Sequence, residues 1–294
     1  MTQPGQSRLV PYLFALPAVL VMLIGLFYPV VETLRLSAYE VRLGEAPSES
    51  TFRGVRLFAE VLADPSVRQS MLVTLKFSVI VVAVEMVVGV GLALMLEGRL
   101  PGMSVLRTIF VLPMMIAPVC VGLIWRYMFD TSAGPINAWI AGLGLKPAWL
   151  ADADLAFFAV CVTDIWQFTP FVFIMALAGL QGLDSSLVEA ARIDGARLWQ
   201  IIWHIKLPLL MPIVMITLLM RLIDALRGLE VVYALTNGGP GLSTELFSLH
   251  IYKSAFVTQR MGHSAALSIC LLVVTASLSA ILLAFNNPLK RGAA

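Results

Sequence analysis

Residues 71–96 read MLVTLKFSVIVVAVEMVVGVGLALML, and only Lys76 and Glu85 in this stretch carry a charge. The hydrocarbon core of a bilayer is about 30 Å thick, and an α-helix needs about 20 predominantly apolar residues to cross it. An apolar run of about 10 to 14 residues is typical of a buried helix in a soluble protein, and this run is about twice as long. The stretch therefore predicts a helix that crosses a membrane.

The composition of the whole chain agrees with this interpretation. The 294 residues are 59% hydrophobic and 13% charged, whereas soluble domains are about 25% charged. So few charges do not cover the surface of a water-soluble globule, and the same composition excludes a disordered or fibrous chain. The net charge of +2 gives no basic surface for nucleic acid. Cys120, Cys161 and Cys270 lie within apolar runs, which indicates buried thiols rather than disulfides or metal ligands.

Six apolar runs are long enough to span a bilayer, which predicts an all-α membrane protein with six transmembrane helices. The first run follows Arg8 and is too long for the apolar part of a signal peptide, so we expect a retained helix. Pro113 and Pro118 interrupt the third run and Pro170 the fourth, which membrane helices tolerate where neighbouring helices satisfy the freed backbone groups. The predicted segments are a cytoplasmic N-terminus at 1–9 and a single transmembrane domain at 10–294, with spans near 10–31, 71–96, 105–128, 155–180, 209–229 and 262–285.

Loop charges predict the orientation, because Lys and Arg accumulate on the cytoplasmic side of a membrane protein. With the N-terminus inside, the inside segments and Arg107 carry eight basic residues, and the outside segments also carry eight over almost twice the length. The higher density of basic residues in the inside segments therefore favours cytoplasmic N- and C-termini, although the first outside segment holds five arginines. The inside segments are 1–9, 97–104, 181–208 and 286–294, and the outside segments are 32–70, 129–154 and 230–261.

The inside segment 181–208, QGLDSSLVEAARIDGARLWQIIWHIKLP, is too apolar and too regular for a simple connector. Ser186 and Glu189 have the spacing of a capping box, which predicts a short helix after the serine. Gly195 then provides a turn, and a second helix is expected to end at Pro208, where the fifth span begins. Periodicity alone is equally compatible with an amphipathic helix that lies on the bilayer surface.

The spacing of this segment resembles the EAA signature of binding-protein-dependent ABC importer permeases. The matching residues are Glu189–Ala191, Gly195 after three further residues, and Ile205–Pro208 after nine more. Residues Thr236–Gly241, TNGGPG, also look like the turn-rich outer loop of the carbohydrate-uptake branch of that family. The resemblance covers most of the chain from the second predicted span onward, and it implies the MetI-like fold of the maltose- and glycerol-phosphate-type permeases.

In that family the EAA segment is a coupling helix that docks on a cytoplasmic ATPase. The resemblance implies a non-catalytic transport subunit in the plasma membrane of a prokaryote, which receives a mono- or disaccharide from an extracytoplasmic binding protein. Implied partners are two P-loop ATPase subunits and a second, similar permease that forms a heterodimer with this chain. No P-loop sequence is present here, so ATP and Mg belong to the ATPase and no cofactor is expected in this chain. The implied coupling residues are Glu189, Ala190, Ala191, Asp194, Gly195 and Ala196.

Ionisable residues at bilayer depth are costly, so each one indicates a pairing or a function. Four charged residues from Arg221 to Glu230 alternate in sign every three positions, and pairing along the fifth span is the simpler interpretation. Asp164 has no basic residue one turn away on the fourth span, so its partner must come from another helix, water or substrate. The alternative interpretation is a polar and aromatic path for a sugar, formed by Asp164, Trp166, Gln167, Arg221, Asp224 and Asn237.

Other classes of function remain open from the residues alone. Glu85, Asp164 and Arg221 suit the ion relay of a secondary transporter or channel, although the EAA spacing argues against that class. An intramembrane enzyme is disfavoured because no G-x-S-x-G or H-E-x-x-H sequence occurs. Among importers, glycerol phosphate or another small polar solute is the alternative to a sugar, but Arg221 and Arg227 are a sparse set of cations for a phosphate ester.

Overall fold

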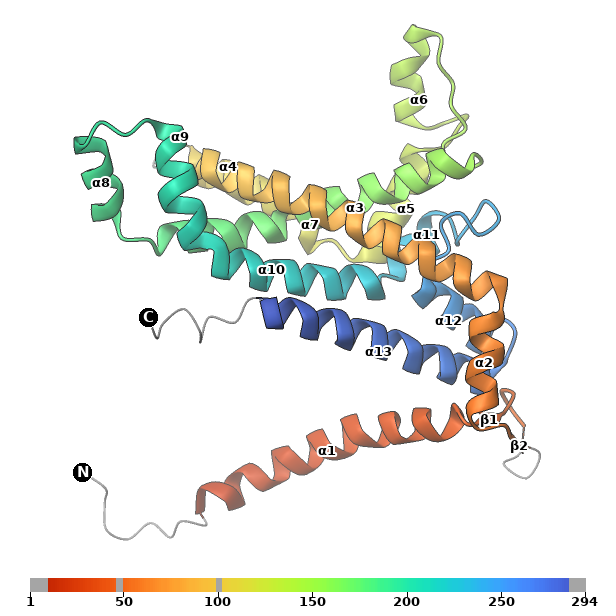
Figure 1. Cartoon of the computed structure of the whole chain (residues 1–294). Helices are drawn as coiled ribbons and strands as arrows, with labels where there is room; N and C mark the ends of the chain where they lie inside the picture. The colour runs from red at the N-terminus through yellow and green to blue at the C-terminus, as the bar shows by residue number, and fades with distance from the viewer. Residues whose placement is uncertain (1–9, 46–49, 99–101, 286–294) are drawn as a thin grey trace. The chain divides into compact units, whose positions relative to one another are not determined.

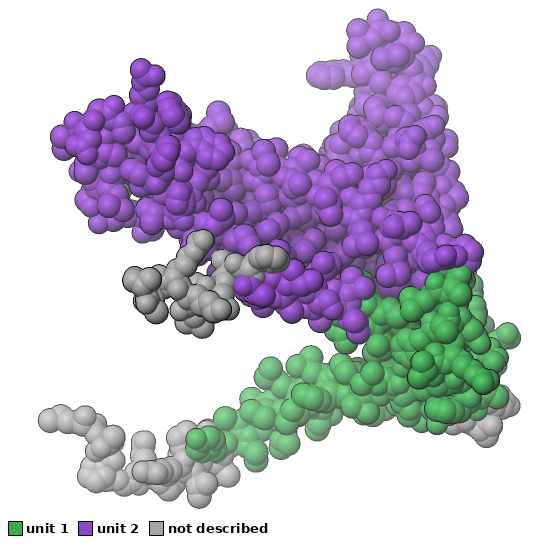
Figure 2. Space-filling view, viewed as in Figure 1, with its two compact units in different colours: residues 1–64, 251–272 green, residues 65–250, 273–294 purple. Residues whose placement is uncertain are grey.

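The computed structural model describes residues 10–45, 50–98 and 102–285, and its elements are helical except for one small sheet (Figure 1). The predicted all-α class is thereby confirmed, while the predicted N-terminal segment 1–9 lies outside the described residues. The chain divides into two units, residues 1–64 with 251–272 and residues 65–250 with 273–294 (Figure 2). Each unit is described by itself.

The first unit contains the N-terminal helix and the sheet. The sheet pairs Tyr39 with Phe52 in antiparallel register. Two backbone hydrogen bonds tie the chain near the sheet to the turn before the last helix: Leu43 N–H donates to Gln259 O at 2.8 Å, and Gly262 N–H donates to Val41 O at 3.1 Å. Its elements are α1 (Val10–Leu36), β1 (Tyr39–Glu40), β2 (Thr51–Phe52), α2 (Val55–Ala63), and parts of α12 (Phe247–Phe256) and α13 (Met261–Phe285), which both units share.

The second unit is organised around two long helices, α3 and α7, with α10 packed against both. Ala93 of α3, Phe173 and Ala176 of α7 and Leu210 of α10 form one buried core cluster. Figure 1 shows α8 and α6 at opposite ends of this unit. Its elements are α3 (Pro65–Leu96), α4 (Met103–Met115), α5 (Pro118–Met128), α6 (Pro135–Ile140), η2 (Ala141–Leu143), α7 (Ala153–Gln181), α8 (Ser185–Ile193), α9 (Leu198–Ile201), the π-helical turn η3 (Ile202–Lys206), α10 (Leu207–Arg227) and α11 (Glu230–Leu235).

Five helices within the described part of the chain are long and apolar enough to cross a membrane. The third predicted span is a pair of helices, α4 and α5, which meet at 96° and give six spans if counted as one. Ala117 has an extended backbone because the ring of Pro118 disfavours a helical residue before it, so the helix ends there and a new one starts. The single-helix spans are Phe14–Leu36, Pro65–Leu96, Ala153–Gln181, Leu198–Arg227 and Met261–Ala284.

The expectation that a helix ends at Pro208 is wrong. The helix that starts at Leu198 continues through Pro208 to Arg227 as one 30-residue element. Proline lacks an N–H and its ring displaces the carbonyl four residues earlier. The structure accommodates it with the π-helical turn η3, in which Leu207 N–H donates to the oxygen of Ile202, five residues earlier. The fifth predicted span therefore begins inside the segment that was expected to be a loop.

The close packing of α3 on α7 predicts a stability difference between two glycines of α3. A Cβ added at Gly89 would lie 2.7 Å from Val172 Cβ, whereas one added at Gly91 would meet nothing within 4 Å. We expect Gly89→Ala to lower the free energy of unfolding by about 1–3 kcal/mol through overpacking. The matched control Gly91→Ala should be neutral or stabilising by up to about 1 kcal/mol. Thermal and chemical unfolding of the purified variants in detergent measures both, and equal effects would contradict this packing.

Candidate functional site

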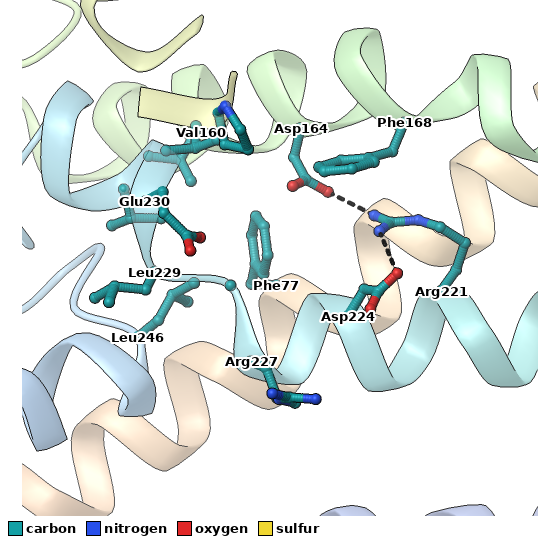
Figure 3. Close-up of a pocket in the computed structure, with 14 residues that line it drawn as sticks. Phe77, Val160, Asp164, Phe168, Arg221, Asp224, Arg227, Leu229, Glu230 and Leu246 are labelled. Atoms are coloured by element: carbon teal, nitrogen blue, oxygen red, sulfur yellow. Dashed lines mark hydrogen bonds and ion pairs between the residues drawn. The ribbon is translucent and has the colours of Figure 1, made fainter. Parts of the chain in front are cut away.

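A cavity of about 390 Å³ opens between α3, α5, α7, α10 and α11 in the second unit (Figure 3). Charged and aromatic side chains line it side by side, and Leu229, Val231 and Leu246 add apolar surface. This mixture is unusual for a membrane protein interior, where an ionisable residue marks a pairing or a function. The charged lining residues are Asp164, Arg221, Asp224, Arg227 and Glu230, and the aromatic ones are Phe77 and Phe168.

Arg221 is the centre of this site and is only 1% exposed. Its Nε lies 2.7 Å from Glu85 Oε2 and its Nη2 lies 2.9 Å from Glu85 Oε1, which is a bidentate pair. The same Nη2 donates to Asp164 Oδ2 at 3.0 Å. The guanidinium also stacks over the ring of Phe168, with 4.2 Å from Cζ to the ring centroid. One cation therefore joins α3, α7 and α10 at the wall of the cavity.

The predicted pairing along the fifth span is wrong in its main feature. Arg221 does approach Asp224, at 3.9 Å from Nη1 to Oδ2, but its shorter contacts are with Glu85 and Asp164 on other helices. Glu230 lies on α11 and not on the span, because α10 ends at Arg227. Figure 3 shows Asp164 and Asp224 turned toward the Arg221 guanidinium from two different helices. The partner expected for Asp164 from another helix is thus Arg221.

The charges of the site do not cancel. Arg221 is surrounded by three carboxylates, and two of them, Glu85 and Asp164, are buried with it. Asp224, Arg227 and Glu230 are exposed side chains on the cavity wall. Hydrogen-bonding groups of these types bind hydroxyl groups as donors and acceptors, and the aromatic rings offer an apolar face beside them. The cavity therefore suits a polyhydroxylated solute better than an anion.

The other three residues predicted for a substrate path lie away from this cavity. Gln167 is buried and its Nε2 donates to the Ile116 carbonyl at 3.1 Å, where the α4–α5 bend frees a backbone group. Trp166 is 40% exposed and packs edge-on against Trp125, with ring centroids 5.6 Å apart. Asn237 lies in an exposed turn with a φ of 50°. The structure therefore brings together Asp164, Arg221 and Asp224 from the predicted set.

The two aromatic residues that line the cavity were missed from the sequence. Phe168 follows Asp164 by four positions, so both lie on one face of α7, and this spacing was a usable signal. Phe77 lies on α3 beside the Lys76 that the sequence singled out, and nothing in its apolar run distinguishes it from its neighbours. Aromatic residues in an apolar run are ordinary core residues, which hides those that line a cavity.

The coupling segment predicted at 181–208 contains α8, and its N-terminal cap differs from the prediction. Asp184, not Ser186, is the cap, and its Oδ1 accepts the Ser186 N–H at 2.9 Å. This hydrogen bond holds the pKa of the Asp184 carboxyl below its ordinary value. A carboxylate satisfies a free N–H and also interacts favourably with the helix dipole, which a serine does not.

The helix α8 ends in a Schellman motif at Gly195. This confirms the turn that was predicted at this glycine. Gly195 has a φ of 80°, its N–H donates to Arg192 O at 3.1 Å, and Ala196 N–H donates to Ala191 O at 2.9 Å. No residue of α8 is buried, and the apolar side chain of Ile193 is 86% exposed. The segment is therefore a short, well-capped helix with no buried side chain, and its Leu187 and Ile193 are exposed.

The buried pairing of Arg221 predicts a large loss of stability when the cation is removed. Arg221→Met leaves Glu85 and Asp164 buried without a counter-charge, which should cost about 3–5 kcal/mol of unfolding free energy. Arg227→Met, a control on the same helix at an exposed position, should change it by less than about 0.5 kcal/mol. Chemical unfolding in detergent distinguishes them, and similar losses would refute the central position of Arg221.

The cap of α8 predicts a local effect with a defined pH dependence. Asp184→Ala should lower the hydrogen-exchange protection of the first amides of α8, whereas Asp184→Asn, which keeps an acceptor oxygen, should retain most of it. Because the folded pKa is lowered, the wild-type cap is complete above the ordinary aspartate pKa of about 4 and is lost as pH falls through the lowered value. Mass spectrometry of exchange measures both effects. Loss of protection between pH 7 and 5 would contradict the cap.

Known proteins that are similar to this chain in sequence and in fold identify its family. The trehalose/maltose transport system permease MalF of Thermococcus litoralis is 36% identical over 273 residues, covering 92% of each chain. The sn-glycerol-3-phosphate transport system permease UgpA of Agrobacterium fabrum is 32% identical over 275 residues, covering 93% of each. A chain in the crystal structure of a bacterial alginate ABC transporter shares the fold, with a TM-score of 0.84 at 22% identity over 95% of this chain and 94% of that one.

A family model supports the same assignment over most of the chain. It covers residues 58–291, which include the whole cavity and the segment 181–208 that contains α8. Membership in this family settles the choice between a transport permease subunit and the channel, secondary-transporter and enzyme alternatives. The chain belongs to the family of inner membrane components of binding-protein-dependent transport systems.

Proposed function

We propose that this chain is one of two permeases of an ATP-driven importer, and that it passes a mono- or disaccharide from an extracytoplasmic binding protein into the cytoplasm. The observation that carries the proposal is α8 at the EAA positions. It is a nine-residue helix with no buried residue, capped at both ends, between α7 and the helix that continues into α10. Such a helix exposes Leu187 and Ile193 for a partner protein.

The proposed membrane arrangement has six spans, with the bent pair α4–α5 counted as the third. Residues 10–294 act as one transmembrane domain, and both termini lie in the cytoplasm, as the loop charges favour. This orientation puts α8 on the cytoplasmic side, where an ATPase can reach it. It puts α6, at the other end of the second unit, on the side of the binding protein.

The proposed partners follow from the family and from what this chain lacks. Two P-loop ATPase subunits hold ATP and Mg, because no P-loop sequence occurs here. A second, similar permease completes the pore as a heterodimer. Glu189, Ala190, Ala191, Asp194, Gly195 and Ala196 form the contact with the ATPase.

The charge of the cavity favours a neutral sugar over glycerol phosphate. Asp164, Asp224 and Glu230 line it with Arg221 and Arg227, and Arg221 is already paired with buried carboxylates. A phosphate ester carries about two negative charges at neutral pH and needs cations that are not neutralised. The similarity to a glycerol-phosphate permease keeps that solute as the alternative. In this proposal Asp164, Arg221 and Asp224 face the solute, whereas Trp166, Gln167 and Asn237 support the path from outside the cavity.

A reconstituted complex in proteoliposomes tests this function. We expect labelled maltose or trehalose to enter the vesicles when ATP and the cognate binding protein are present, and labelled glycerol 3-phosphate not to enter. Glu189→Ala and Gly195→Pro should lower uptake per ATP hydrolysed by about fivefold or more, since a φ of 80° is closed to proline.

Gly144→Pro is the matched control for the coupling variants. Gly144 also has a left-handed backbone, with a φ of 74°, but lies next to α6 and η2 and far along the chain from α8. It should keep uptake per ATP near the wild-type value in the complexes that assemble. Unchanged uptake per ATP in both coupling variants would refute the role of α8, and uptake of the phosphate ester alone would refute the sugar.

A further inference from the structure

A second ion pair joins α3 to the helix that continues into α10, two of the three helices that Arg221 joins, at the end of the second unit where α8 lies. Lys206, at the last position of η3, pairs with Glu97, which follows the last residue of α3. Lys206 is only 6% exposed, and a buried ammonium group is costly unless a carboxylate compensates it. The pair links positions 109 residues apart in the sequence.

Glu97 lies close to both ends of the coupling segment. Its carboxylate contacts Lys206 where the segment runs into α10. It also lines a polar cavity of about 540 Å³ together with Gln181 and Ser185, where the segment leaves α7. The end of α3 therefore closes the base of the loop that carries α8.

Arg107 of α4 fixes the position of this end of α3. Its Nη2 donates to Leu96 O at 2.6 Å and to Gly98 O at 3.2 Å, so a guanidinium satisfies the free carbonyls at the helix C-terminus. Arg107 also lines the polar cavity with Glu97. Glu97 is thus held in place by a neighbouring helix rather than left on a loose loop.

The two ion pairs make α3 and α10 a doubly connected pair of antiparallel helices. Glu97–Lys206 lies at the base of the coupling segment, and Glu85–Arg221 lies at the cavity. On an α-helix the twelve positions from Glu85 to Glu97 span about 18 Å. A displacement of the coupling segment therefore reaches the cavity wall along two helices that are tied at both levels.

We propose that the Glu97–Lys206 ion pair is the joint through which movement of the coupling segment is transmitted to α3. Glu97 and Lys206 are positioning residues, since neither lines the cavity of the candidate site. The inference rests on the proposed coupling function of α8. With the joint intact, α3 follows α10 when the ATPase moves α8. With the joint broken, α10 moves while α3 lags, so ATP is hydrolysed without full opening of the path.

The test measures uptake per ATP hydrolysed in the reconstituted wild-type complex and its variants. Glu97→Gln and Lys206→Met should each lower this ratio by about fivefold or more, while ATP hydrolysis itself continues. The charge swap Glu97→Lys with Lys206→Glu should restore it to within about twofold of wild type, because the pair is remade with opposite polarity. Asp154→Asn, the same carboxylate-to-amide change at an exposed site on α7, should have no effect.

The outcomes separate this inference from the proposed function. If the wild-type complex transports no sugar, the proposed function is refuted, whatever the variants do. If the single variants keep the wild-type uptake per ATP hydrolysed, the role of the Glu97–Lys206 ion pair as a joint is refuted. A single variant that does not assemble, rescued in both assembly and ratio by the charge swap, supports the joint. A swap that does not assemble, or assembles without regaining the ratio, overturns it, because a remade ion pair then fails to transmit the movement.

Discussion

The second unit depends on one guanidinium group that is shared between helices far apart in the sequence. Charges inside a bilayer-spanning bundle have no water to stabilise them, so they must find partners in the protein. Arg221 meets this constraint with Glu85 of α3 and Asp164 of α7, and Phe168 covers its face. The position of the cavity follows from this, because the same three helices form its wall at the point where the ion pairs join them.

Apolar packing holds the same three helices together between the two ion pairs. Ala93, Phe173, Ala176 and Leu210 of α3, α7 and α10 form one buried apolar cluster there. Small residues bring the helix backbones closest together, and at Gly89 of α3 there is no room for a methyl group beside Val172. The bundle thus alternates between a dry, close-packed layer and layers held by ion pairs.

The spans could be predicted from the sequence because an apolar run of bilayer length is a local property. The turn at Gly195 could also be predicted locally, because glycine favours the left-handed backbone that the structure has there. Pro118 indicated where the third span breaks. The angle of 96° between α4 and α5 could not be predicted, because it depends on the helices that pack against them. Asp184 and Ser186 lie two positions apart and both are residues that cap helices, so the spacing alone does not decide which of them is the N-cap. The pairing of Arg221 with residues 57 and 136 positions away was beyond any local pattern.

The continuous helix from Leu198 to Arg227 has a mechanical consequence. Two buried ion pairs fix it to α3, one at Lys206 and one at Arg221. These two points are about 22 Å apart at 1.5 Å per residue. A helix held at one point can rotate about that point, whereas a helix held at two points moves only together with its neighbour. A motion that enters at the α8 end therefore displaces α3 and α10 as one stiff body and does not rotate one helix against the other.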